Sequence, residues 1–258
     1  MAQNWHTLLV GGGRRDGDAE TVLRLSLPAG ARGYADAQID DYGGPRPAGA
    51  PRFRHQPGLV LSLRARFSPD IAGTAGFGFW NAPYGDPATR RLALPAAAWF
   101  FYASAPNDLP FAPEPGRGWF AATLDSGAPR ALALLPLAPA TLLLNQFGPL
   151  RRRLWPAVRR RLGISAAPLA AARPAATPDT WRDYRLEWRP DGCCFLVDGA
   201  PVLTTTTSPR GPLGFVCWVD NQYLVLTPRG RFRSGYLPVA SEQWLEVAEV
   251  TIRPPAKR

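Results

Sequence analysis

The sequence predicts an all-β protein, a jelly-roll sandwich of two antiparallel sheets with one inserted segment. Short apolar runs recur along the chain, and several alternate between apolar and polar residues, as half-buried strands do. The 29 prolines and 25 glycines are spread between these runs and favour turns over long helices. With 46% hydrophobic and only 19% charged residues, the chain has the composition of a folded protein and not of a disordered one.

A chain of 258 residues can bury a large core within one sandwich, so we expect a single domain over residues 1–258. Residues 59–67 show the alternation most clearly, because all their odd positions are apolar. Turn-forming residues at 190–192 and 198–199 predict hairpins between three successive strands. The strands are expected near residues 21–27, 37–42, 59–67, 74–81, 95–103, 118–124, 182–189, 193–198, 201–206, 213–219, 222–227 and 243–253.

Residues 127–177 interrupt this pattern. They are rich in Ala, Leu, Pro and Arg, and residues 151–162 have the spacing of a short basic amphipathic helix. Pro156 suits the first turn of such a helix, and Gly163 suits its C-terminal cap. We therefore interpret 127–177 as an insertion within the sandwich. The apolar face of its helix would consist of Leu154, Trp155, Val158 and Leu162.

The formal net charge of +10 is concentrated in this insertion. Residues 126–178 hold eight arginines and no acidic residue, whereas the rest of the chain holds 22 basic and 20 acidic residues. The basic helix is open to three interpretations: a solvated surface, an anionic membrane contact or a nucleic-acid contact. We do not expect nucleic acid, because the surrounding strands lack interleaved basic and aromatic residues. The arginines that would meet a membrane are Arg151, Arg152, Arg153, Arg159, Arg160 and Arg161.

The N-terminus lacks the apolar stretch of a secretory signal, so we expect a cytoplasmic protein that is at most peripheral to a membrane. Cys193 and Cys194 are adjacent in a predicted strand and therefore face opposite sides. With Cys217, we interpret them as small buried residues in a reducing compartment. His6 and His55 are the only histidines, too few for a zinc site, and we expect neither metal nor cofactor.

The most specific feature is residues 181–199, where the pattern W-x-x-Y-x-L-x-W is followed by a turn and by F-L-V-D-G. This segment resembles a strand pair of the concanavalin A-like lectin/glucanase superfamily, in particular of family 16 glycoside hydrolases and laminin-G-like sandwiches. A looser match covers residues 61–67 and 77–80, so that the resemblance touches residues 60–105 and 181–253. It implies a concanavalin-like jelly roll and specifies the fold rather than the chemistry.

The same resemblance argues against hydrolysis. The hydrolases carry E-x-D-x-x-E on a strand whose outer glutamates act as nucleophile and acid/base, with carboxyls roughly 5–5.5 Å apart. Here the corresponding strand is residues 96–103, AAAWFFYA, which holds no carboxylate. The family's catalytic motif is therefore missing from this chain.

Two groups of residues suit a binding cleft. In residues 76–80, GFGFW, the glycines and Trp80 share one face, so the glycines would leave room for a ligand beside an aromatic platform. Residues 220–222, Asp-Asn-Gln, follow the strand that contains Trp218 and offer donors and acceptors to a hydroxyl-rich ligand. The alternatives are aromatic core packing for the first group and a hairpin turn for the second.

We favour non-hydrolytic binding of a carbohydrate-like or amphipathic small molecule in an aromatic concave cleft. A first alternative is a divergent glycoside hydrolase or lyase with Asp41 or Asp220 as acid/base and Tyr102 or Tyr223 assisting; two carboxyls in one groove would favour it. A second is a membrane-associated interaction protein held by the helix near 151–162. The cleft would be lined by Trp80, Asn81, Trp99, Tyr102, Trp218, Asp220, Asn221 and Gln222.

Overall fold

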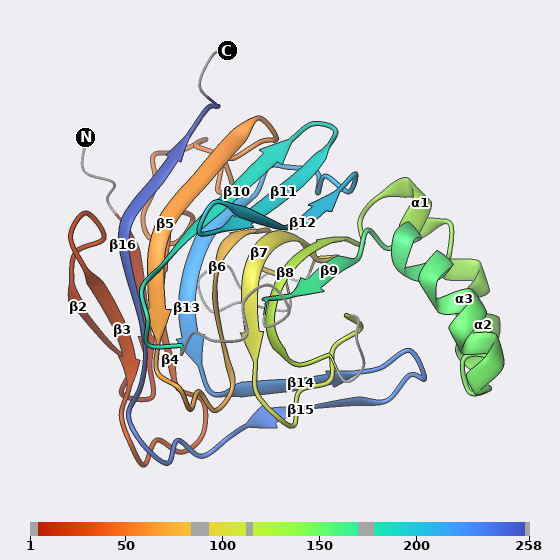
Figure 1. Cartoon of the computed structure of the whole chain (residues 1–258), viewed down its shortest axis with the longest axis horizontal. Coiled ribbons are helices and arrows are strands. Elements are labelled where there is room, and N and C mark those ends of the chain that lie inside the picture. Colours follow the sequence, from red (N-terminus) through yellow and green to blue (C-terminus); the bar gives the residue numbers. More distant parts are fainter. Residues whose placement is uncertain (1–4, 84–92, 112–115, 170–177, 256–258) are drawn as a thin grey trace.

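The computed structural model describes residues 5–83, 93–111, 116–169 and 178–255. Two seven-stranded antiparallel sheets pack face to face (Figure 1), which confirms the predicted all-β sandwich. The first sheet contains, in spatial order, β1 (His6–Val10), β4 (Asp36–Asp40), β13 (Gly214–Asp220), β6 (Thr74–Trp80), β7 (Ala96–Ala103), β8 (Gly118–Asp125) and β9 (Ser165–Pro168). The second contains β12 (Ala200–Thr205), β11 (Gly192–Val197), β10 (Arg182–Arg189), β5 (Leu59–Phe67), β16 (Gln243–Arg253), β3 (Leu23–Leu27) and β2 (Arg14–Gly17). A separate hairpin of β14 (Gln222–Leu226) and β15 (Phe232–Tyr236) runs along the lower side of the sandwich in Figure 1.

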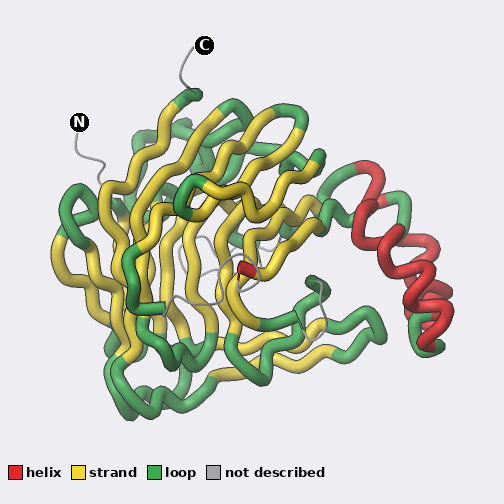
Figure 2. The backbone as a smooth tube through the Cα atoms, in the orientation of Figure 1, coloured by secondary structure: helices red, strands yellow, loops and turns green. Residues whose placement is uncertain are grey.

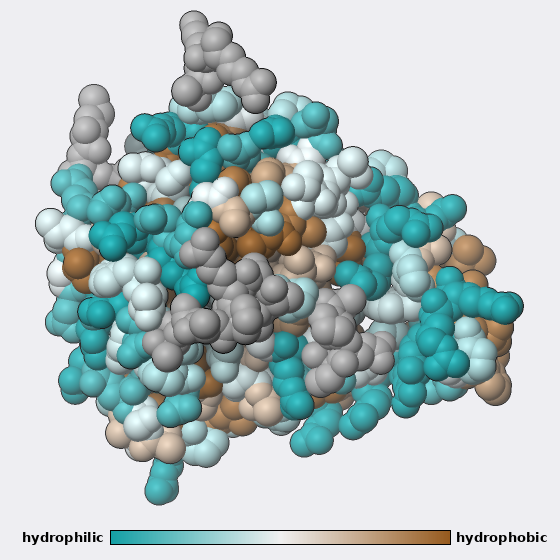
Figure 3. All heavy atoms as spheres, viewed as in Figure 1, coloured by the Kyte–Doolittle hydropathy of each residue, from teal (hydrophilic) through white to brown (hydrophobic). Residues whose placement is uncertain are grey.

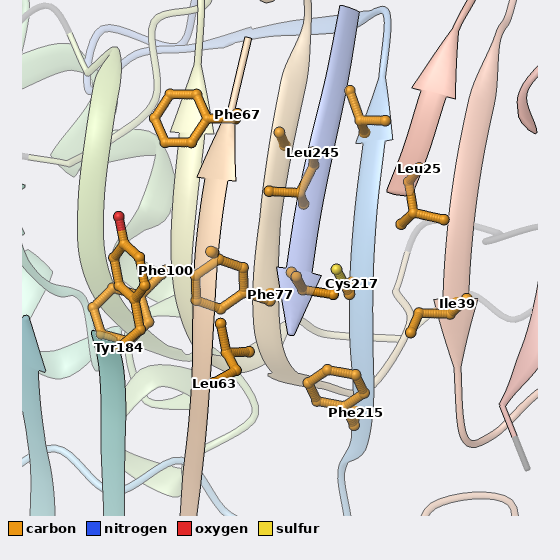
Figure 4. Packing of buried hydrophobic residues seen from close by; sticks show 14 of the residues in the cluster. Leu25, Ile39, Leu63, Phe67, Phe77, Phe100, Tyr184, Phe215, Cys217 and Leu245 are labelled. Carbon is orange, nitrogen blue, oxygen red and sulfur yellow. The ribbon is translucent and has the colours of Figure 1, made fainter. Parts of the chain in front are cut away.

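The main hydrophobic core lies between the two sheets. Phe77 and Phe100 of the first sheet meet Tyr184 of the second (Figure 4), whose ring centroid lies 5.0 Å from each phenylalanine ring. Strand alternation produces this packing: Leu63 is buried, whereas the next residue, Arg64, is exposed. Burying one such phenylalanine contributes roughly 1.5–3 kcal/mol relative to an exposed ring, so the sandwich is held mainly by these inward faces.

Residues 181–199 form the β10–β11 hairpin of the second sheet and the turn that follows it. Tyr184, Leu186 and Trp188 are buried, while the residues between them are more exposed. Asp198 and Gly199 have φ of 50° and 76° at the turn into β12, as a two-residue type I′ turn requires. The pattern in residues 181–199 therefore marks the core-facing residues of β10 and the turn that follows β11, as predicted.

All the predicted strands are present, with boundaries within two residues of those expected. The structure adds β1, β2, β9 and β15, which the sequence pattern does not predict. The first three lie at sheet edges, and β15 belongs to the separate hairpin. A strand beside solvent needs no apolar alternation, and β2 reads Arg-Arg-Asp-Gly.

The insertion contains the helices α1 (Pro129–Leu132), α2 (Ala138–Leu144) and α3 (Gly148–Arg161) and the 3-10 turn η1 (Leu135–Leu137), gathered at one side of the sandwich (Figure 2). Because α3 begins at Gly148, Pro156 lies inside the helix. The prediction that Pro156 occupies the first turn is therefore wrong. Pro149 occupies that turn instead, where the missing N–H costs no helical hydrogen bond. Gly163 follows the C-cap with φ of +66°, as predicted.

The predicted apolar face of α3 is half-buried, and no described side chain of that helix is fully buried. Figure 3 shows hydrophobic side chains at the outer edge of the helical insertion beside strongly hydrophilic ones. No helix in the described part of the chain is long and apolar enough to cross a membrane. The exposed apolar side chains of the insertion include Leu142, Leu143, Leu144, Phe147 and Leu150.

The three cysteines are free thiols, with Cys193 and Cys217 buried and Cys194 half-buried. Burial raises the pKa of Cys193 to about 12 and also raises the pKa of Cys217. Neither buried thiol is therefore ionised near neutral pH, and both pack as small apolar residues.

Candidate binding site

A second aromatic cluster covers the outer face of the first sheet, opposite the main core. Trp80, Trp99 and Trp218 come from the neighbouring strands β6, β7 and β13 and face the same side. The rings of Trp80 and Trp218 are nearly parallel, with an interplanar angle of 4° and centroids 6.1 Å apart. The centroid of Trp99 lies 5.8 Å from that of Trp80 and 5.7 Å from that of Trp218. The three indoles thus form a continuous aromatic surface.

Gly76 and Gly78 make room for these indoles. A Cβ atom at Gly76 would lie 2.4 Å from the carbonyl oxygen of Phe100 and 2.8 Å from Cη2 of Trp218. A Cβ atom at Gly78 would lie 2.6 Å from Cα of Trp99. The expectation that these glycines leave space for a ligand is corrected: the neighbouring tryptophans occupy that space.

A cavity of about 480 Å³ opens on this aromatic surface. Its volume lies within the range of about 300–1,000 Å³ that is usual for small-molecule sites. Of the residues predicted to line a cleft, five line the cavity: Trp80, Trp99, Trp218, Asp220 and Gln222. The loop after β7 and the β14–β15 hairpin supply further walls, including Asn107, Leu109, Phe111, Tyr223 and Tyr236.

Asp220 marks a polar end of the cavity. Its Oδ1 accepts hydrogen bonds from Oγ1 of Thr74 at 2.7 Å and from the backbone N–H groups of Thr74 and Gln222, both at 3.1 Å. Trp218 Nε1 donates to the same Thr74 hydroxyl at 3.0 Å, which couples the indole to the carboxyl. Burial raises the pKa of Asp220 to about 7, although these hydrogen bonds act in the opposite direction. The carboxyl therefore titrates near neutral pH.

A second carboxyl, Asp36, faces Asp220 across the pair of strands β4 and β13. Both acids line the cavity, and side chains directly opposite each other have Cβ atoms about 4.5–5.5 Å apart. Gln38, two residues along β4, also lines it, and its amide donates to Tyr42 Oη at 3.3 Å. We did not predict Asp36 or Gln38, although their alternation with Asp40 in β4 is a sequence signal that places all three on one face.

Trp99 holds a buried donor without a partner among the described residues. The residue is 9% exposed, and within the described part of the chain its indole Nε1 has no hydrogen-bond partner. Trp80 differs, because its Nε1 donates to Tyr42 Oη at 2.7 Å. A buried indole N–H without an acceptor is unfavourable, but this nitrogen is itself covered by protein atoms and offers no accessible donor to the cavity.

Two predicted cleft residues serve the backbone instead. The Asn81 amide donates to the Leu94 carbonyl, and its Oδ1 accepts from the Ala96 N–H. Asn221 is fully buried, where Oδ1 accepts from the Ala35 N–H at 2.8 Å and Nδ2 donates to two backbone carbonyls. The structure places neither side chain along the cavity. Asn221 is therefore a structural group, but it bonds backbone far away in the sequence and not, as the hairpin alternative had it, the backbone of its own turn.

Tyr102 and Asp41 also lie away from the cavity. Tyr102 packs on the inter-sheet side, with its ring centroid 5.9 Å from that of Phe67, because it follows Phe101 and so faces the other way. Asp41 Oδ1 accepts from the Phe215 N–H, while Oδ2 lies 2.5 Å from His55 Nε2. The structure therefore uses Asp41 to hold a loop, and the only predicted acid/base candidate that lines the cavity is Asp220.

On β7, the residues that face the cavity side are Ala97, Trp99, Phe101 and Ala103. These four side chains are small or aromatic, and β7 presents no carboxylate on this side of the sheet.

Comparison with known proteins supports the fold. The endo-β-galactosidase from Clostridium perfringens that releases GlcNAcα1-4Gal is similar with a TM-score of 0.51 and 11% identity, covering 98% of this chain and 58% of that chain. A β-glucanase from Bacillus licheniformis has a TM-score of 0.42 and 11% identity, covering 98% and 92% of the two chains. No family model and no curated protein sequence matches the chain.

The Clostridium perfringens enzyme has the concanavalin A-like lectin/glucanase fold, and this chain shares that fold. The resemblance carried by residues 181–199 is thereby confirmed at the level of architecture. At identities near 11%, the likeness shows the fold alone, which is associated with carbohydrate binding or hydrolysis.

Proposed function

We propose that the protein binds a carbohydrate-like or amphipathic small molecule on the aromatic surface of this cavity without hydrolysing it. The observation that carries the proposal is the set of three adjoining indoles beside a polar end in one cavity. Flat apolar indole faces suit sugar rings or alkyl chains, and the Gln222 side chain offers hydrogen bonds to polar groups. The missing glutamates on β7 support binding over cleavage.

Trp80→Ala tests this proposal, because Trp80 is half-buried and lines the cavity. A glycan array and a lipid overlay should first identify ligands, whose affinity is then measured by calorimetry. We expect the variant to weaken binding about tenfold or more, as removal of a central aromatic contact does. The matched control is Trp244→Ala, since Trp244 lies half-buried on the second sheet against the Arg24 guanidinium. Blank screens, or equal affinities for the two variants, would refute the proposal.

The facing carboxyls favour a second candidate function, acid/base cleavage of a glycan by Asp220 and Asp36. A carboxyl that is still protonated near pH 7 can act as a general acid, and Asp220 meets that condition. Tyr223 lines the same cavity and could assist. Release of reducing ends or unsaturated sugars by the wild type, lost in Asp220→Asn and Asp36→Asn, would establish this activity. Intact substrates after prolonged incubation would exclude it for the glycans tested.

We also propose a peripheral membrane contact for the insertion. The exposed Leu142, Leu143 and Phe147 lie just before α3, whose Arg152 and Arg160 are exposed. Apolar side chains beside arginines suit an anionic lipid surface. Sedimentation with anionic and neutral liposomes tests this contact independently of the cavity.

A further inference from the structure

The cavity differs in charge from the protein that contains it. The chain has 30 basic and 20 acidic residues. The described residues that line the cavity include two acids, Asp36 and Asp220, and none of these lining residues is Arg, Lys or His. Asp220 therefore places a carboxylate in a lining that holds no basic side chain among the described residues, although the chain as a whole is basic.

One carboxylate oxygen of Asp220, Oδ2, accepts no hydrogen bond from the described residues. Every hydrogen bond that its side chain accepts within the described residues ends on Oδ1, from Thr74 and from the Gln222 N–H. Its Oδ2 accepts none there, although the residue is only 8% exposed. An ionised carboxylate that is largely removed from water, and that has no counter-ion among the described residues, is costly. A ligand that supplies a positive charge and an N–H donor at Oδ2 would offset that cost.

The aromatic walls favour the same kind of ligand. The face of an aromatic ring carries negative charge and attracts organic cations, most strongly for tryptophan. Trp80, Trp99 and Trp218 present such rings, and Tyr34 and Tyr236, whose ring centroids lie 5.5 Å apart, add two more. A neutral hydroxyl group would bond to Oδ2 but would leave the negative charge uncompensated. An ammonium group satisfies both the carboxylate and the rings.

We infer that the ligand carries a protonated amino group, which binds Asp220 Oδ2 while its sugar ring or alkyl chain lies on the indoles. The inference rests on the proposed function and specifies its ligand class. The same chemistry can come from an amino sugar or from an amphipathic amine.

Two matched pairs of probes test the inference by calorimetry. One pair is the glucosamine tetramer and its neutral N-acetylated form at pH 7; the other is hexylammonium and hexanol at pH 8. The proteins are the wild type, Asp220→Asn and the control Asp191→Asn, whose aspartate is exposed in the β10–β11 turn. Asparagine retains Oδ1 as an acceptor, so the variant keeps the hydrogen bonds from Thr74. Thermal melts confirm that each protein is folded.

We expect the amine of at least one pair to bind the wild type and Asp191→Asn about 10- to 100-fold more tightly than its neutral partner. This preference should disappear in Asp220→Asn. A preference confined to the tetramers identifies an amino sugar, and one confined to the hexyl pair identifies an amphipathic amine.

Equal affinities within both pairs, or a preference that survives in Asp220→Asn, overturn the inference; the proposed function then stands if Trp80→Ala still weakens binding. Failure of every probe to bind the wild type overturns the inference. If Trp80→Ala leaves the ligand affinity unchanged, both the proposed function and the inference that rests on it are refuted.

Discussion

Replacing Asp220 by asparagine should make the protein less sensitive to pH. Burial raises the pKa of Asp220 from 3.8 to about 7, so between these values the folded protein keeps a proton that the unfolded chain has released. The unfolded state then binds fewer protons, and the contribution of this group to the free energy of unfolding falls as pH rises. The asparagine side chain would carry no charge and would keep the acceptor at Oδ1, so the substitution would remove this loss while preserving the contacts with Thr74.

The size of the effect follows from the same shift. The pKa of Asp220 in the folded protein, about 7, lies about two units above pH 5, and each unit corresponds to 1.36 kcal/mol of free energy. Between pH 5 and pH 8.5, the free energy of unfolding of the wild type should therefore fall by about 3 kcal/mol relative to that of Asp220→Asn. The other titratable groups along the cavity, Asp36, Tyr34, Tyr223 and Tyr236, are present in both proteins. The comparison between the two proteins thus reports the charge at position 220 together with its effect on Asp36, which lies opposite.

Urea denaturation at pH 5, 6, 7 and 8.5 measures this difference, with the midpoint and the m-value fitted at each pH. The exposed control Asp191→Asn should follow the wild type throughout. Repulsion among the 29 arginines is the same in all three proteins and cancels in the comparison. The difference in the free energy of unfolding between the wild type and Asp220→Asn should change across this pH range. A change of less than about 1 kcal/mol would show that the buried carboxyl does not cause the pH dependence of stability.

Three further predictions concern the sheet, the cavity and the insertion. Gly76→Ala should lower the free energy of unfolding by about 1–3 kcal/mol, because its Cβ would meet Phe100 and Trp218, and urea denaturation would contradict this if the midpoint stayed constant. Tyr102→Phe should leave ligand affinity unchanged in calorimetry, because Tyr102 faces the inter-sheet core; a large loss of affinity would place it in the site after all. Replacing Arg152, Arg153, Arg160 and Arg161 by serine should reduce sedimentation with anionic liposomes, whereas Arg233→Ser in β15 should not. Equal sedimentation of the two variants would refute a membrane role for the insertion.

Local alternation predicted most of the fold, because it is a property of one strand at a time. Tyr184, Leu186 and Trp188 could be assigned to one face without knowing what packed against them. The same rule separates Trp99 from Tyr102, which are three positions apart on β7 and so face opposite sides of the sheet. The prediction that both line one cleft is therefore wrong for Tyr102, which packs toward the inter-sheet core.

The polar end of the cavity depends on information that no single segment contains. Asp36 meets Asp220 because β4 and β13 pair in one register, although these strands are far apart in the sequence. The structure shows a conflict in these two strands: every residue of β4 and of β13 is buried, although β4 carries two carboxylates and β13 carries one. Carboxylates rarely enter such strands without a partner or a role, and departures from local rules concentrate at functional sites. Asp36, Asp40 and Asp220 are such departures; Asp40 is satisfied by His6 and Gln38, whereas Asp220 keeps an oxygen that no described donor reaches. That difference is the physical reason for placing the ligand at Asp220.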